Sequence, residues 1–435
     1  MRDQLIRGKP TFLSLGKLNV NSSSDAEHKI ACASGDAMEA LMSFGVLMWR
    51  AGSTAIRTRE CMEMMAQKIG FDEMAISLSL DSITANTVRR SLELTTTMRV
   101  IGPPGVNAWR IGELEELAKS GGPDIGLRDI ATKLAQIESA PPLYSRTRII
   151  AAIALASASF ALLNGAGVRE ATAAAVGGGT GQCLRLWLSR RQQNQYGTAT
   201  LSAMLASGSY VLVAALASSL GFEFTHYPAG FIASVLFLVP GFPLIAALFD
   251  LLQYQTVAAV SRFAYGAMML LAVAFGLSII VEVAGVDISR QPPPELAYSA
   301  KLVLRAAASF IAASGFAISF NSPARTALAV GCLALVANEL RLVLTDTGLM
   351  IAPAAFLGAL SMGTLAVLLE RLLKLSRMTT VVAPIVIMIP GVYAFEMIVL
   401  LNRGQVLEAL QAAALLGFAV GALAMGLATA RFFSR

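Results

Sequence analysis

A chain of 435 residues that is 55% hydrophobic and only 14% charged is too apolar for a soluble globular protein of this length. Its net charge of +6 would suit nucleic-acid binding, but the basic residues are scattered at the ends of apolar runs, as the positive-inside rule requires. These runs are nearly continuous, which is typical of membrane helices and not of barrel strands. The composition therefore predicts a helical protein whose environment is the lipid bilayer, with no nucleic-acid partner.

The first 142 residues differ from the rest, because charged residues recur every few positions up to Pro141 and Pro142 and become rare beyond them. The leader at 1–30 is polar and lacks the unbroken apolar core of a secretory signal. We predict a disordered leader over 1–30 and a cytoplasmic α+β domain over 31–142. Apolar spacing in that domain predicts two helices, two strands and two helices, at 36–51, 54–69, 74–80, 92–101, 108–119 and 127–138.

Ten apolar segments follow, and each can cross roughly 30 Å of hydrocarbon as a helix. With the N-terminal domain inside, twelve Lys and Arg residues lie at the cytoplasmic ends of the segments and six at the opposite ends. This bias predicts that both termini are cytoplasmic. The segments are 148–167, 171–189, 199–220, 229–252, 257–284, 300–320, 325–344, 349–369, 379–401 and 408–431.

An internal repeat relates the two halves of this region, 143–290 and 291–435. Residues 160–188 align without gaps on 316–344, with nine of 29 positions identical. The informative matched pairs are Phe160/Phe316, Arg169/Arg325 and Arg185/Arg341. Because each half has an odd number of crossings, the second half enters the bilayer inverted, as in many secondary transporters. The predicted fold is a membrane all-α protein: about ten transmembrane helices as two inverted five-helix repeats, preceded by a small soluble α+β domain.

A Pro-Gly pair lies near the middle of the fourth segment and again five segments later. The first is Pro240-Gly241, followed by Pro243, and the second is Pro390-Gly391. Matched interruptions of this kind indicate broken helices whose free backbone groups bind a substrate. An ordinary proline kink is the alternative at each position.

Carboxylates inside membrane segments are costly and point to function. Glu396 is the deepest and is the predicted proton carrier or ligand of a substrate ammonium group. Asp250, with Arg262, and Glu339 are predicted to act in ion coupling or gating, although each carboxylate could instead form a structural ion pair with an arginine. Three polar residues could line a cavity or join helices by hydrogen bonds: Asn164, Gln182 and Asn338.

Other classes of chemistry have little support in the sequence. The GGGTG run at 177–181 lacks a following GK[ST], and no Walker A motif occurs in the chain, so transport would be driven by a gradient. The only two histidines are His28 and His226, and no HExxH or GxSxG motif is present, which argues against an enzyme. The four cysteines share no CxxC spacing and are interpreted as packing residues. We predict no metal and no cofactor.

Three stretches of the sequence resemble the threonine/serine exporter family. They are AGSTAIRTRECMEMMAQKIGFD, VIGPPGVNAWRI, and LVPGFPLIAALFDLL followed by SRF at 261–263. Together with the second Pro-Gly pair, their order and spacing extend the resemblance over essentially the whole chain. By position, Pro240, Gly241, Pro243, Asp250 and Arg262 fall on the family's first-half motif, and Pro390 and Gly391 on its second-half motif.

The resemblance implies an antiporter that exports threonine and serine across a bacterial inner membrane, driven by proton motive force. Its partners would be a small-molecule substrate, protons and the lipid bilayer, and a homo-oligomer is an open alternative. Family members that are split into two subunits are associated with dicarboxylate export, so the substrate stays open. A receptor with an N-terminal signalling domain is a further alternative, although one membrane span would be enough to anchor it.

Overall fold

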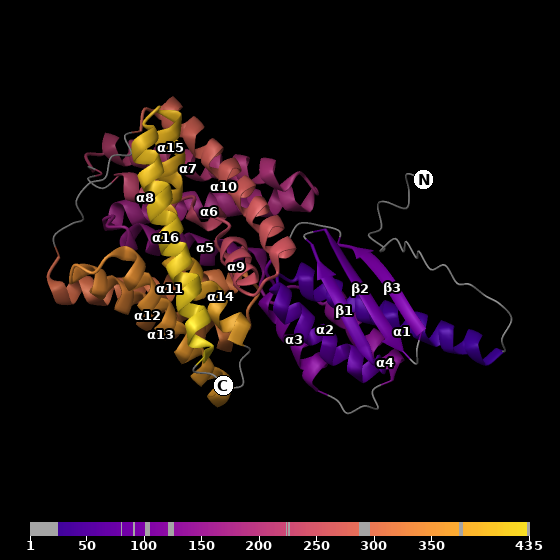
Figure 1. Cartoon of the computed structure of the whole chain (residues 1–435). Helices are drawn as coiled ribbons and strands as arrows, with labels where there is room; N and C mark the ends of the chain where they lie inside the picture. Colours follow the sequence, from indigo (N-terminus) through magenta and orange to yellow (C-terminus); the bar gives the residue numbers. More distant parts are fainter. Residues whose placement is uncertain are drawn as a thin grey trace. The chain divides into compact units, whose positions relative to one another are not determined.

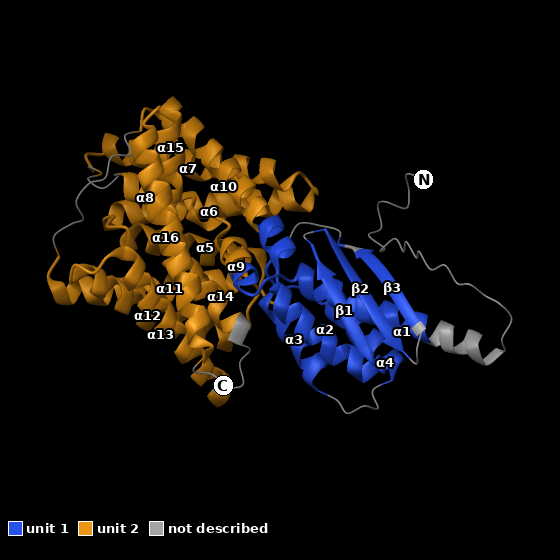
Figure 2. Ribbon diagram, viewed as in Figure 1, with its two compact units in different colours: residues 1–142, 249–262 blue, residues 143–248, 263–435 orange. Residues whose placement is uncertain are grey.

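The computed structural model describes residues 25–79, 81–89, 92–100, 105–120, 126–222, 224, 227–286, 296–373 and 377–432 (Figure 1). Two compact units are distinguished: unit 1 contains residues 1–142 and 249–262, and unit 2 contains 143–248 and 263–435 (Figure 2). Residues 1–24 of the predicted leader lie outside the described residues, and the first helix begins at Asp25.

Unit 1 combines four helices with a three-stranded antiparallel sheet of order β1-β2-β3. One sheet face is apolar and contributes Ile76, Ile83, Ala85 and Met98 to the core of the unit. Helices α1 and α2 pack on the sheet and cover this core. The elements are α1 (Asp25–Arg50), α2 (Ala55–Ile69), β1 (Glu73–Leu78), β2 (Ser82–Arg89), β3 (Leu92–Arg99), α3 (Ala108–Lys119) and α4 (Leu127–Ser139).

The central strand, β2, is absent from the sequence-based expectation of two strands. Its sequence, SITANTVR, is mostly polar and contains neither glycine nor proline to mark a boundary. Pairing on both sides stabilises it nevertheless, since Ile83 lies opposite Leu78 on β1 and opposite Met98 on β3. These cross-strand apolar contacts are tertiary and are invisible in the local pattern.

Unit 2 is helical in every described segment, and all ten predicted apolar segments fall on helices. Two of the ten are interrupted at their Pro-Gly pair. The helices are α5 (Arg146–Leu163), α6 (Val168–Arg190), α7 (Gln195–Ser219), α8 (Tyr227–Ala233), η1 (Leu236–Leu238), α9 (Gly241–Leu252), α10 (Thr256–Ala284), α11 (Tyr298–Ser319), α12 (Ala324–Asp346), α13 (Ile351–Leu373), α14 (Arg377–Met388), α15 (Gly391–Asn402) and α16 (Val406–Ala430).

Seven of the described helices are long and apolar enough to cross a membrane, and the number rises to nine if each of two bent pairs is one span. The expected tenth, α6, is a helix of 23 residues, but its polar and small residues make it less apolar than the others. Large apolar side chains face outward from unit 2, including Leu212, Leu216, Phe275, Leu410 and Phe418. The protein is therefore a multi-pass membrane protein.

Connections in the first half of the membrane region match connections in the second half. The α5–α6 and α11–α12 connections each contain one residue with positive φ, at their second position. The same holds for α6–α7 and α12–α13, and for α9–α10 and α15–α16. Because few residues other than glycine adopt this backbone, three matched positions are informative. The pairs are Gly165 (φ 85°) and Asn321 (58°), Gln192 (50°) and Gly348 (92°), and Tyr254 (60°) and Gly404 (76°).

Candidate functional site

The two Pro-Gly pairs break their helices by the same local turn. In each, the glycine N–H donates to the carbonyl oxygen two residues earlier: Gly241 to Val239 and Gly391 to Ile389, both at 2.8 Å. Pro390 has φ −77° and ψ 71°, the backbone of an inverse γ-turn. The chain bends by 62° at the first break and by 46° at the second. Both interruptions are therefore true helix breaks, as the sequence predicts.

The two breaks also approach each other closely. A Cβ atom added at Gly241 would lie 2.9 Å from Ile389 Cδ1, and one added at Gly391 would lie 2.8 Å from Leu236 Cδ2. Ile389 immediately precedes the second Pro-Gly pair, and Leu236 lies on η1, just before the first. The contact is thus reciprocal, with the glycine of each break touching the segment that leads into the other.

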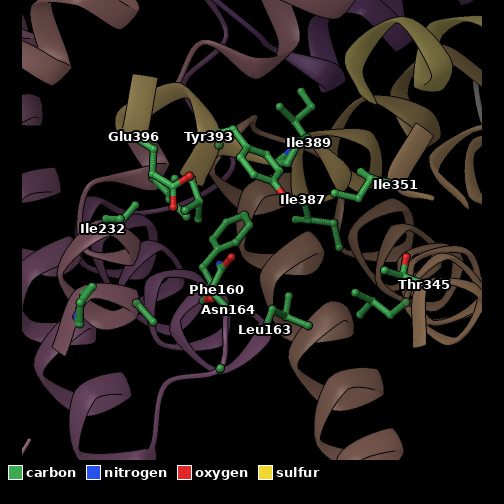
Figure 3. A pocket seen from close by; sticks show the side chains of 18 of the residues that line it. Phe160, Leu163, Asn164, Ile232, Thr345, Ile351, Ile387, Ile389, Tyr393 and Glu396 are labelled. Atoms are coloured by element: carbon green, nitrogen blue, oxygen red, sulfur yellow. The ribbon is translucent and has the colours of Figure 1, made fainter. Parts of the chain in front are cut away.

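A cavity of about 340 Å³ lies beside the second break, within unit 2. In Figure 3, Glu396 and Tyr393 of α15 approach it from one wall, while Phe160 of α5 and Asn164, which follows the end of α5, lie on the opposite wall. Apolar residues of α8, η1 and α14 complete the lining, so polar groups are few and discrete. The polar side chains among the lining residues are Asn164, Arg341, Thr345, Tyr393 and Glu396.

Of the residues singled out from sequence, Pro390, Gly391 and Glu396 line this cavity. The first-half residues Pro240, Gly241 and Pro243 are not among its lining, although Gly241 packs against the lining residue Ile389. Asn164 belongs to the cavity wall, whereas Asn338 is fully buried and hydrogen-bonded between helices. The structure therefore brings together only the second-half part of the predicted site.

Asp250 and Arg262 lie elsewhere, in the 249–262 segment of unit 1: Asp250 near the end of α9 and Arg262 in the second turn of α10. The Ala55 N–H, at the first residue of α2, donates to Asp250 Oδ1 at 2.9 Å. Asp250 Oδ2 pairs with Arg262 Nε at 3.4 Å. Thr54 precedes α2 without a capping side-chain bond, so the Asp250 carboxylate supplies the N-terminal acceptor and the favourable negative charge.

Arg262 extends this cluster to α1. Its guanidinium carbon lies 4.0 Å from the centre of the Trp49 ring, and one of its nitrogens donates to the Ser53 carbonyl. Both members of the ion pair are buried. Within unit 1, Asp250 and Arg262 therefore anchor residues 249–262 to α1 and α2.

Glu339 lies outside the cavity on α12. Its two carboxylate oxygens accept no hydrogen bond from the residues that the structure describes. The carboxylate of Asp346 forms ion pairs with both Lys301 and Arg305. Lys301 Nζ lies 3.0 Å from Asp346 Oδ1, and Arg305 contacts Oδ2. The ion pair that the sequence allows for Glu339 thus forms at Asp346 instead.

Arg341 also lines the cavity, although the sequence pattern marks it only as one of the matched positions of the repeat. Its Nε donates to Asn338 Oδ1 at 3.0 Å, and Asn338 Nδ2 donates to Ser309 Oγ at 2.8 Å. The available signal was an arginine three residues after an asparagine inside an apolar segment, because such polar groups rarely occur at membrane depth without a role.

Comparison with known proteins agrees with the resemblance noted in the sequence. Residues 39–284 match the family ThrE, described as "Putative threonine/serine exporter", and residues 305–433 match the family ThrE_2, described as "Threonine/Serine exporter, ThrE". The chain is 24% identical over 243 residues to a protein of Escherichia coli (strain K12) named probable succinate transporter subunit YjjP, covering 55% of this chain and 92% of that protein.

The protein of the same name from Klebsiella aerogenes is 24% identical over 228 residues, which cover 52% of this chain and 85% of the relative. No solved structure matches the chain significantly. The two family matches lie in order along the chain and together cover unit 1 from residue 39 onward, both Pro-Gly breaks and the cavity. This multi-pass membrane protein therefore belongs to the threonine/serine exporter family, with both of the family's matching regions in a single chain.

Proposed function

We propose that the chain is a secondary exporter that moves threonine and serine out of the cytoplasm across a bacterial inner membrane. The observation that carries the proposal is the cavity of about 340 Å³ in which the second helix break and the Glu396 carboxylate meet. An intramembrane carboxylate in a cavity is typical of a substrate or ion pathway. A cavity near the lower end of the range for ligand pockets fits a small amino acid.

Glu396 would couple export to the proton motive force. The ammonium group of an amino acid and a proton both bind a carboxylate, so the two compete for Glu396. If only one occupies the site at a time, substrate export and proton entry alternate, which makes the protein an antiporter.

Alternating access would follow from two inverted five-helix repeats, 143–290 and 291–435, behind a cytoplasmic domain over 31–142. In this proposal each broken pair and α6 count as one span, which makes ten spans, so that both termini would lie on the same side, in the cytoplasm. Three matched connections and the reciprocal packing of the breaks support a two-fold relation. Phe160 and Phe316, which align in the repeat, meet edge to face with ring centroids 5.6 Å apart, as expected beside such an axis.

The other candidate residues take separate roles in this proposal. Pro240, Gly241 and Pro243 shape the break before α9, which packs against the cavity-lining residue Ile389. Asp250 and Arg262 act in gating through the α9–α10 hairpin, and Glu339 is the second candidate for ion coupling because its carboxylate accepts no hydrogen bond within the described part of the chain.

Dicarboxylate export is the second candidate function. It is favoured by the printed name of the two curated relatives, which describes a succinate transporter subunit. The presence of Glu396 in the cavity favours an amino acid, since a carboxylate repels a dianion and attracts an ammonium group.

Uptake into inside-out vesicles tests the proposal and separates the two substrates. Vesicles that contain the protein should accumulate labelled threonine and serine, and a pH gradient, acidic inside, should increase the accumulation. Vesicles with the Glu396→Gln variant serve as the matched control. Accumulation of succinate alone would replace the proposed function by the second candidate.

A further inference from the structure

We infer that Arg341 binds the carboxylate of the substrate and that Asn338 and Ser309 position its guanidinium group. This inference rests on the proposed function, because it assigns a specificity residue to the same cavity. It also names the feature of the substrate that the cavity requires, a free carboxylate group.

The first step is that Arg341 is available to a ligand. It lines the cavity, and none of the ion pairs among the described residues includes it. Asp346, five residues later on α12, is already paired with Lys301 and Arg305. Arginine stays charged at any physiological pH, so its counter-charge has to come from another group, and a bound anion would provide it.

The second step is that the guanidinium is held in one orientation. Arg341 Nε donates to Asn338 Oδ1 at 3.0 Å, and Asn338 in turn donates to Ser309 Oγ at 2.8 Å. Asn338 and Ser309 are both completely buried, so this relay has little freedom. With Nε engaged, the two terminal nitrogens of the fork remain for a bidentate contact with a carboxylate.

The third step excludes the simplest rival, the amino end of α15. Broken helices commonly receive an anion on their free N–H groups. Here the Gly391 N–H donates to Ile389 O at 2.8 Å and the Tyr393 N–H donates to Pro390 O at 3.1 Å. Two of the first three N–H groups of α15 are therefore already used in hydrogen bonds. The charged guanidinium group of Arg341 is the stronger binding site for an anion.

The test compares threonine with threonine amide, in which a neutral amide replaces the carboxylate. Purified full-length protein in liposomes exchanges labelled threonine, and each compound is added as an inhibitor. Loss of a charged hydrogen bond predicts that Arg341→Gln weakens threonine inhibition about 10- to 100-fold while threonine amide changes less than about threefold. Arg341→Lys should give an intermediate loss, because it keeps the charge without the fork.

Two further variants separate binding from folding. Arg325→Gln removes an exposed arginine from the same helix and should leave both inhibitors unchanged. Asn338→Ala keeps the charge of Arg341 but removes its support, and should reduce the preference for threonine over its amide about threefold to tenfold. An equal loss for both compounds in Arg341→Gln, or an unchanged preference in Asn338→Ala, would overturn the inference.

The substrate and the role of Arg341 can fail independently. If the wild-type protein exchanges succinate and not threonine, the proposed function is wrong, and the comparison is repeated with succinate and succinamide. If Arg341→Gln then weakens inhibition by succinate more than inhibition by succinamide, the inference is still supported. If the variant weakens inhibition by both compounds equally, the inference is contradicted.

Discussion

The two broken helices share one backbone design but have different chemistry. Both have the same turn at their Pro-Gly pair, and both end in a hairpin with one residue of positive φ, Tyr254 in the first and Gly404 in the second. The carboxylates differ: Asp250 lies near the end of α9, whereas Glu396 lies in the first half of α15. The residue of α9 at the same distance from the break as Glu396 is Ala246. The residue of α15 at the same distance as Asp250 is Leu400.

In the proposed function, this difference separates the gating contact of Asp250 from the substrate-binding role of Glu396. Asp250 contacts the amino end of α2 and Arg262, both in unit 1, while Glu396 lines the cavity in unit 2. A symmetric sequence pattern therefore predicts where helices break but not which of the two carboxylates lines the cavity. The predictions below test this separation.

Glu396→Gln should have the largest effect. A pH gradient should no longer accelerate threonine efflux, and the affinity in exchange should fall about tenfold or more, because the ammonium group loses its counter-charge. Transport in proteoliposomes, with and without a gradient, measures both quantities. Glu408→Gln, an exposed carboxylate of α16, is the control. Unchanged affinity and unchanged pH dependence in Glu396→Gln would make Glu396 a structural residue.

Asp250→Asn should act on unit 1. It leaves Arg262 buried without its charged partner, which costs about 3 kcal/mol for a broken buried ion pair. If that cost falls on the first turn of α2, amide hydrogen exchange at Ala55–Thr58 should accelerate about a hundredfold. Mass spectrometry of the full-length protein measures this exchange, and Glu116→Gln, exposed on α3, should not change it. Full protection of α2 in Asp250→Asn would show that the pair does not anchor the hairpin.

Gly391→Val tests the reciprocal packing of the breaks. The added side chain meets Leu236 Cδ2, so the two breaks should be forced apart and transport should fall about tenfold. Leu236→Ala in the same chain removes the obstacle and should restore most of the rate, which vesicle uptake measures. A double variant no better than Gly391→Val would mean that this contact does not limit transport.

Cys61 gives the smallest predicted effect, a pH dependence of unit 1. Burial raises the pKa of the Cys61 thiol from 9.0 to about 12. Because the folded state holds this proton more tightly, the stabilisation is complete below pH 9 and is lost as pH rises from 9 toward 12, by about 1.4 kcal/mol per pH unit. Cys61→Ser should show a shallower decline in denaturant unfolding of unit 1 between pH 9 and 10. Equal slopes in the two proteins would contradict the shifted pKa.

Much of the fold could be predicted from local sequence patterns. Apolar runs place the ten helical segments of unit 2 within a few residues, and Pro240 and Pro390 place the breaks, because hydropathy and missing backbone donors act locally. Strand β2 could not be found this way, since its pairing with two neighbours outweighs its polar composition. The apolar segments of the sequence suggest ten spans. Helix α6 is not apolar enough to be identified as a span from its length and composition alone.

The candidate site was only partly predictable, for a similar reason. Glu396 can be recognised from sequence because a carboxylate inside a membrane segment is costly. Pro390 can be recognised because a Pro-Gly pair breaks a helix. The ion pair of Asp250 with Arg262 could be suggested from the sequence. Its second partner, the backbone of Ala55, lies 195 residues away in sequence and has no chemical signature. Arg341 resembles any arginine near the end of a membrane segment until the cavity and the Asn338 contact are visible.

Protection of a cysteine in the cavity tests most directly whether the second break binds the substrate. In a variant without native cysteines, Thr345→Cys lies on the cavity lining, and Thr347→Cys lies two residues beyond it on the same chain segment. Maleimide labelling is measured with and without a saturating concentration of the transported amino acid. We predict that the substrate slows labelling at position 345 at least fivefold and leaves position 347 unchanged. Unchanged labelling at both positions, in protein that still transports that substrate, would contradict the assignment of the site.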